Sequence, residues 1–158
     1  MTALARCLPA CACLVLLAPA VHAQTVAHGW GPRVGFSSDP DQMVLGGQLV
    51  IGEIAPDITF DPSLEFGFGD DRTTIAVNFD GHYHFRVGGS GWRPYMGVGV
   101  GIIFEDRDGG DSDTNVAGGL ILGTGVPTSA GNRFFSELKL GIGDAPSIKI
   151  MVGWNFRM

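Results

Sequence analysis

The sequence has few charged residues and no cysteine beyond its first segment. Only 16% of the 158 residues are Asp, Glu, Lys or Arg. The three cysteines, Cys7, Cys11 and Cys13, all fall within residues 1–23, so the rest of the chain forms no disulfide and offers no thiol for catalysis. The 16 acidic residues outnumber the 10 basic ones, giving a formal net charge of −6. Because the basic residues form no patch, we expect no nucleic acid partner.

Beyond residues 1–23 the chain also lacks a helical pattern, a linker and any sign of a second domain. Its 25 glycines are about twice the usual share, but they follow no Gly-X-Y period, which excludes a collagen-like chain. Apolar residues make up 45% of the sequence and are spread evenly, which excludes a disordered chain. The length fits a single folded domain.

Residues 1–23 have the features of a secretory signal peptide. Arg6 supplies the positive charge, Cys7–Ala20 is an uncharged apolar run, and Val21–Ala23 ends in the small residue that signal peptidase requires. The apolar run is shorter than the roughly 20 residues of a transmembrane helix, which argues against a membrane anchor. We therefore predict a signal peptide over 1–23 and an exported domain over 24–158.

Apolar and polar residues alternate along eight segments of the exported domain, with the period of two that indicates β-strands. Along Ile75–Val87, for example, Val77 and Phe79 lie on one face and Asn78 and Asp80 on the other. The segments are 30–36, 43–51, 58–68, 75–87, 92–104, 116–126, 134–142 and 148–158. Turn signals rich in Gly, Asp and Pro separate them. Because Pro62 cannot donate to a ladder, we expect a bulge or a break within the third segment.

Eight strands joined by short hairpins form an antiparallel meander, and closing it into a barrel removes its edges. A soluble lipocalin-like barrel would enclose an apolar ligand within its apolar face, whereas a membrane barrel turns that face to lipid. Two features favour the membrane barrel. Glycine collects on the polar face, where a narrow interior needs small residues, and only Tyr95 and Phe135 of the fifteen aromatic residues lie on that face. We predict an all-β fold, an eight-stranded antiparallel up-and-down transmembrane β-barrel; the secreted lipocalin-like binder is the alternative.

The aromatic residues of the apolar face fall at two levels, as expected where rings meet lipid headgroups. With both termini on one side, the rim near the termini carries Trp30, Trp92, Trp154 and Phe156, and the opposite rim carries Phe66, Phe68 and Phe104.

The polar face predicts an interior network of both charge signs. Its members are Arg33, Glu65, His82, His84, Arg86, Arg93, Glu137, Lys139 and Lys149; the same face also carries Gln48, Asp61, Asn78, Asp80, Tyr95, Glu105, Arg133, Asn155 and Arg157. Charges removed from bulk water need partners, so this set should form a polar plug that blocks a wide pore. A small ion or proton path is the alternative. We interpret the two histidines as hydrogen-bonded interior residues rather than as metal ligands.

Two further features bear on ligands and catalysis. Asp106, Asp108, Asp111 and Asp113 surround two glycines in one loop and are weak candidates for a divalent cation, but their spacing does not match an EF-hand, which favours a solvated acidic loop. The apolar face offers one serine, Ser136, with no His, Asp or Glu beside it. A nucleophile without a base is not activated, so we expect no enzyme and no cofactor; a lipid A-modifying enzyme is the remaining alternative.

The final residues, VGWNFRM (Val152–Met158), alternate to the chain end. They resemble the C-terminal signal of outer-membrane barrels, with Met158 where Phe is usual. Residues 24–158 as a whole resemble the OmpA/OmpX-like group of small barrels. The resemblance implies residence in a Gram-negative-type outer membrane, assembly by the barrel assembly machinery through Val152–Met158, and contact with outer-membrane lipid and lipopolysaccharide. It also implies a structural or surface-interaction role, and we expect a monomer.

Overall fold

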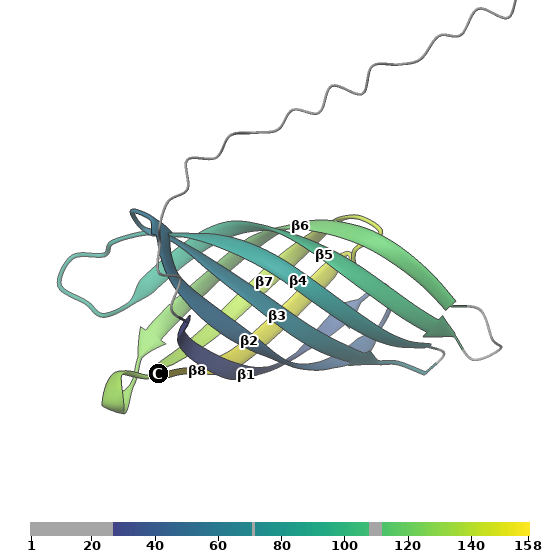
Figure 1. Ribbon diagram of the computed structural model, residues 1–158, viewed down its shortest axis with the longest axis horizontal. Coiled ribbons are helices and arrows are strands. Elements are labelled where there is room, and N and C mark those ends of the chain that lie inside the picture. The colour runs from purple at the N-terminus through teal and green to yellow at the C-terminus, as the bar shows by residue number, and fades with distance from the viewer. Residues whose placement is uncertain (1–26, 71, 108–111) are drawn as a thin grey trace, which may run out of the picture.

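The computed structural model describes residues 27–70, 72–107 and 112–158, which form eight strands (Figure 1). The strands are β1 (Ala27–Ser38), β2 (Gln42–Ala55), β3 (Ile58–Phe68), β4 (Arg72–His84), β5 (Arg93–Arg107), β6 (Ser112–Pro127), β7 (Arg133–Gly143) and β8 (Ile148–Arg157). One 3-10 turn, η1 (Ser129–Gly131), lies between β6 and β7. The segment expected to be a signal peptide lies outside the described residues. Within them, no helix is both long enough and apolar enough to span a membrane.

Each strand pairs antiparallel with the next, and β8 pairs back with β1, so the sheet closes into a barrel. This confirms the predicted eight-stranded up-and-down fold. The start of β1 and the end of β8 lie at one end of the barrel, together with the connections after β2, β4 and β6 (Figure 1). We call this the termini end. The connections after β1, β3, β5 and β7 belong to the opposite end, which we call the far end.

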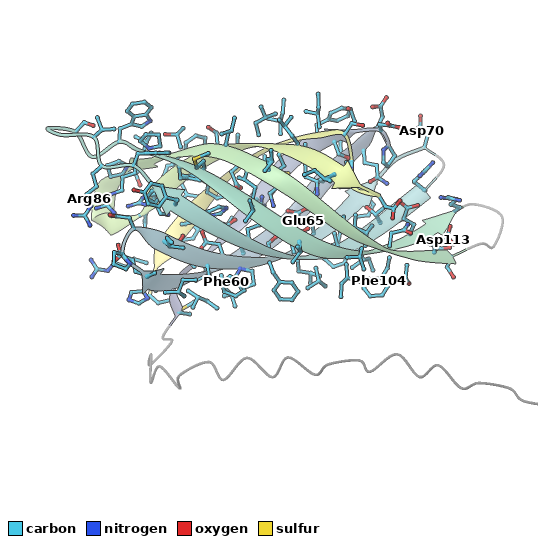
Figure 2. All side chains as sticks on the ribbon, turned by 90° about the horizontal axis from the view of Figure 1, so that it is seen from above. Phe60, Glu65, Asp70, Arg86, Phe104 and Asp113 are labelled. Carbon is cyan, nitrogen blue, oxygen red and sulfur yellow. The ribbon has the colours of Figure 1, made fainter. Side chains whose placement is uncertain are left out.

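Side chains along each strand alternate between the interior and the outer wall. On β4, Asn78, Asp80 and His82 are buried, whereas Ile75 and Phe79 are each 40% exposed. The interior is therefore the polar side and the outer wall the apolar side, which reverses the partition of a water-soluble protein. Figure 2 shows this arrangement, with Glu65 inside the barrel.

Glycine faces a bulky interior side chain at several cross-strand pairs. Gly97, Gly99 and Gly101 of β5 pair with His82, Asp80 and Asn78 of β4, and Gly123 pairs with Tyr95. A Cβ on Gly99 would collide with Oδ1 of Asp80, and a Cβ on Gly123 would collide with the ring of Tyr95. The glycines of the polar face therefore leave room for large polar and aromatic groups in an eight-stranded interior that side chains just fill.

The third segment continues through its proline without the expected bulge. β3 runs unbroken, and its register with β2 is the same on both sides of Pro62. Only the Cα pairing between the two strands is interrupted, between Ser63 and Phe60, because proline has no N–H to donate. The register shifts of this hairpin lie nearer its turn, around Glu53.

Candidate functional site

Arg33 on β1 is the centre of the polar interior, with 1% of its side chain exposed. Its guanidinium donates to Oε1 of Gln48 and to Oε2 of Glu137, each at 2.8 Å, and its Nε lies 3.2 Å from Oε1 of Glu65. The Phe135 ring centroid is 5.7 Å from the guanidinium carbon, within the range of a cation–π contact. One buried cation thereby joins β1 to β2, β3 and β7.

Two lysines, on the last two strands, pair with interior carboxylates. Nζ of Lys149 on β8 donates to Oε2 of Glu65 at 2.7 Å, so this carboxylate receives both Arg33 and Lys149. Lys139 on β7 forms an ion pair with Asp80 on β4. These pairs connect strands that are far apart in the sequence.

His82 on β4 lies between two carboxylates. Its Nδ1 is 2.7 Å from Oδ2 of Asp61, and its Nε2 is 3.5 Å from Oε1 of Glu137. His84, two residues along the strand, is directed to a different partner, because its Nε2 is 3.0 Å from Oγ1 of Thr59. The two imidazole rings are perpendicular, with centroids 6.4 Å apart. Each imidazole therefore has its own polar partner, and the two histidines do not share one.

We call the buried charged set the ion-pair cluster: Arg33, Asp61, Glu65, Asp80, His82, Glu137, Lys139 and Lys149. It holds three permanent cations and four carboxylates, and every member has a partner of opposite charge or an imidazole within 4 Å. Such partners are needed because an isolated charge in this environment is strongly disfavoured. Arg33 Nε and His82 Nε2 lie near their carboxylates without the alignment of a hydrogen bond.

Apolar side chains complete the interior, and the sequence analysis did not single these out. Ile121 and Met151 are almost fully buried beside the ion-pair cluster, since their cross-strand partners are Lys139 and Glu137. Toward the far end, an apolar cluster is formed by Ala76, Ile103 and Ala117. The strand parity that indicated the polar interior also assigns these residues to it, so the signal was present in the sequence.

Two small interior cavities lie on the far-end side of the ion-pair cluster. One has about 40 Å³ of space for the centres of water molecules and reaches Asp80, Lys139 and Lys149. The other has about 20 Å³ and reaches Glu65 and Lys149. Because about 10–15 Å³ is enough for one water, a few waters can contact the cluster from this side.

The expected rim aromatics project from the outer wall near the two ends. At the termini end, Trp30 and Phe156 are cross-strand partners with ring centroids 5.3 Å apart. Trp154 contacts Phe134 at 5.8 Å, and Trp92 directly precedes β5. The far-end group consists of Phe66, Phe68 and Phe104, of which Figure 2 labels Phe104.

Two arginines expected in the interior network lie outside it. The alternation predicted a strand to Val87, but β4 ends at His84 because a glycine-rich connection leaves the barrel there. Arg86 is consequently 77% exposed and donates to Oδ1 of Asp57 at 2.7 Å, a hydrogen bond that raises the pKa of its guanidinium. Arg93, the first residue of β5, is exposed at the same end. Figure 2 shows Arg86 at the termini end.

The far end is the acidic end, as Asp70 and Asp113 show in Figure 2. Of the four candidate cation ligands, Asp108 and Asp111 lie outside the described residues. Asp113 is 3.4 Å from Arg107, which also lies 3.1 Å from Glu105; Asp106 is exposed. Across the described ranges, no three His, Cys, Asp or Glu residues are placed to hold a metal ion.

The serine considered as a nucleophile has apolar or neutral neighbours. Ser136 on β7 has Thr124 on β6 and Val152 on β8 as its cross-strand partners. Neither residue is a base that would remove the proton of the hydroxyl group.

Comparison with known proteins places this barrel among the small transmembrane barrels. No protein-family model matches the sequence, and no curated protein matches it. The N-terminal β-barrel domain of Pseudomonas aeruginosa OprF matches with a TM-score of 0.66 at 16% identity, covering 82% of this chain and 97% of that one. Neisserial surface protein A (NspA) matches with a TM-score of 0.59 at 14% identity, covering 82% and 94%. The outer membrane enzyme PagL matches with a TM-score of 0.53 at 13% identity, covering 82% and 99%. These likenesses show the fold that the sequence predicted.

Proposed function

We propose that the protein is an integral β-barrel of the outer membrane with a structural or surface-interaction role. The observation that carries this proposal is the reversed partition of side chains. Val98 and Val116 are 64% and 71% exposed on the outer wall, whereas Arg33 and Glu65 are 2% and 1% exposed inside. Contiguous exposed apolar surface of more than a few hundred Å² is rare on soluble monomers, and here it surrounds the barrel. Lipid is the environment that makes this surface favourable.

A secreted lipocalin-like barrel fits the same strand count but not this interior. Such a barrel would hold an apolar ligand in an apolar cavity. Here the centre of the described interior is filled by the ion-pair cluster, and the two cavities beside it have room only for water. Accommodating an apolar ligand would require separating buried ion pairs such as Arg33–Glu137.

We further propose that the interior is closed to a wide pore. The ion-pair cluster draws side chains from β1, β3, β4, β7 and β8. Its contacts across the lumen tie β1 to β3, β1 to β7 and β4 to β7. Tyr95 and Phe135 are 7% and 2% exposed and fill the space on the termini side of the cluster. An eight-stranded barrel has no room for a wide pore once such side chains are in place.

The partners we propose follow from the outer wall and the last strand. The apolar wall and its rim aromatics would contact outer-membrane lipid and the acyl chains of lipopolysaccharide. β8 pairs with both β7 and β1, so it is the strand that closes the barrel. Its segment Val152–Met158 would be the element recognised by the barrel assembly machinery. We propose a monomer, because the closed sheet leaves no strand edge for another chain.

We propose a role without catalysis, since Ser136 has no base beside it. Lipid A from a strain that expresses the protein should therefore have the same mass profile as lipid A from a deletion strain. A change in the number of acyl chains that depends on Ser136 would contradict this proposal.

The absence of cysteine from residues 24–158 allows a direct test of location and orientation. Single cysteines are introduced at Asp70, at the far end, and at Ser90, at the termini end, and cells are treated with a membrane-impermeant maleimide. We expect D70C to react in intact cells and S90C to react only after permeabilisation, because the termini would lie in the periplasm. The cysteine-free protein is the matched control.

Two outcomes would contradict the proposal. Reversed labelling of the two variants would overturn the orientation. Recovery of the protein in the soluble fraction after an alkaline wash, or a mobility in SDS that does not change on heating, would overturn the membrane barrel itself.

A further inference from the structure

Three arginines with the strand parity of interior residues lie at the termini end. Arg93 begins β5, Arg133 begins β7 and Arg157 ends β8. Each has the strand parity of buried interior residues, as Tyr95 and Phe135 show for the first two. Within the described parts of the chain, none of the three has a carboxylate within ion-pair distance. They differ in this from every arginine elsewhere in the described barrel.

The acidic groups of this end are engaged elsewhere or are distant from the arginines. Asp57 accepts from Arg86 at 2.7 Å, and Asp61 is 2.7 Å from the imidazole of His82. Glu53 lies on β2, and neither it nor the C-terminal carboxylate of Met158 is within 4 Å of any of the three arginines. The termini end thus carries cationic groups that the described protein does not neutralise.

Two glycines leave room for the side chains of Arg133 and Arg157. Cδ of Arg133 lies 2.5 Å from the position that a Cβ of Gly125 would occupy, and Gly125 is the direct cross-strand partner of Arg93. Arg133 therefore lies across β6 toward Arg93. Nη1 of Arg157 lies 3.9 Å from the Cβ position of Gly131, in the connection that leads to Arg133. Like charges at one end of the barrel without an acid between them repel, so an anion would be bound favourably there.

The residue type indicates the class of anion. A guanidinium presents a planar fork of donors that matches phosphate or carboxylate oxygens in pairs. Three forks offer more donors than one planar carboxylate can accept, whereas a tetrahedral phosphate presents oxygens in several directions. We propose that Arg93, Arg133 and Arg157 form a binding site for a phosphate group. The source would be a free phosphate or a phospholipid headgroup, and the choice of periplasmic sources rests on the proposed orientation.

The experiment uses the folded barrel of residues 24–158 in a phosphate-free glycoside detergent, with folding checked by heat-dependent mobility in SDS. Binding of inorganic phosphate and of dihexanoyl phosphatidylglycerol is measured by calorimetry, in separate titrations. The variants are R93Q, R133Q and R157Q, and the matched control is R86Q, which removes an arginine that already has a partner. Because a hydrogen bond to a charged group contributes about 1.5–3 kcal/mol, each of the three should weaken binding by about tenfold or more.

Each outcome decides the inference. Binding of inorganic phosphate that is weakened in R133Q and unchanged in R86Q supports a free-phosphate site. Binding of phosphatidylglycerol alone, with the same dependence on the variants, supports a headgroup site. Absence of binding of both probes, or equal binding by R133Q and R86Q, overturns the proposal. Since the measurement is made in detergent, it does not depend on where the barrel resides in the cell.

Discussion

Replacing Arg33 by methionine should destabilise the barrel more than any other single change of charge. The substitution keeps most of the side-chain length but removes the cation that contacts Glu65, Glu137 and Gln48. Glu65 would still have Lys149 at 2.7 Å. Glu137 would retain only the Nε2 of His82 at 3.5 Å, and it would therefore be a buried charge without an adequate partner.

The magnitude follows from this uncompensated carboxylate. Removing one member of a buried ion pair costs about 3–5 kcal/mol of unfolding free energy, chiefly because the remaining charge stays buried. Neutralising Glu137 in the same protein should relieve much of this cost. We expect the double variant R33M/E137Q to be more stable than the sum of the two single changes predicts, by about 2 kcal/mol, a size typical of residues in one network.

The assay is urea unfolding of the refolded barrel in phospholipid vesicles, followed by tryptophan fluorescence. Trp30, Trp92 and Trp154 all project from the outer wall, so their emission reports on transfer from lipid to water. The matched control is R86M, at a residue that is 77% exposed. It exchanges the same residue types at an exposed position, where we expect a change within about 0.5 kcal/mol.

Two results would refute the reasoning. If R33M lost less than about 1 kcal/mol, the interior would be hydrated enough to solvate a lone carboxylate. If the loss in R33M/E137Q equalled the sum of the two single losses, Arg33 and Glu137 would not be coupled, in spite of their 2.8 Å contact.

The remaining predictions concern the wall, the glycines and the lumen. Leu120→Arg on the outer wall should lower stability in lipid by about 2–4 kcal/mol, and unchanged urea unfolding would contradict the assignment of that face. Gly99→Ala should destabilise the barrel by about 1–3 kcal/mol because the new methyl group displaces the Asp80 carboxylate. Gly118→Ala should not, because a Cβ there meets only backbone oxygens at 3.8 and 3.9 Å; equal effects would be inconsistent with this packing. The purified monomer should give no large, steady conductance in planar bilayers, and reproducible nanosiemens openings would show a porin instead.

Local pattern was enough to predict how many strands form and which way each side chain faces. A period of two is a property of the extended backbone itself, so the alternation around Phe79 and Asp80 already separates wall from interior. The large number of aromatic residues on one face then favours lipid outside. The alternation also assigns the glycines opposite His82 and Tyr95 to the interior face, although the sequence did not predict which side chains they would face.

The tertiary structure alone decided which charges meet and where the barrel ends. Arg33 pairs with Glu137, 104 positions away, and Lys149 pairs with Glu65, 84 positions away. These contacts depend on the tilt and register of eight strands around a closed sheet, which accumulate over every hairpin and are not encoded in any one segment. The end of β4 at His84 is a similar case. The alternation of apolar and polar residues continues beyond the last residue that pairs with β5, so Arg86 has the parity of an interior residue but lies beyond the end of the barrel. Parity is a local geometric property, whereas pairing and strand length are settled by closure of the whole barrel.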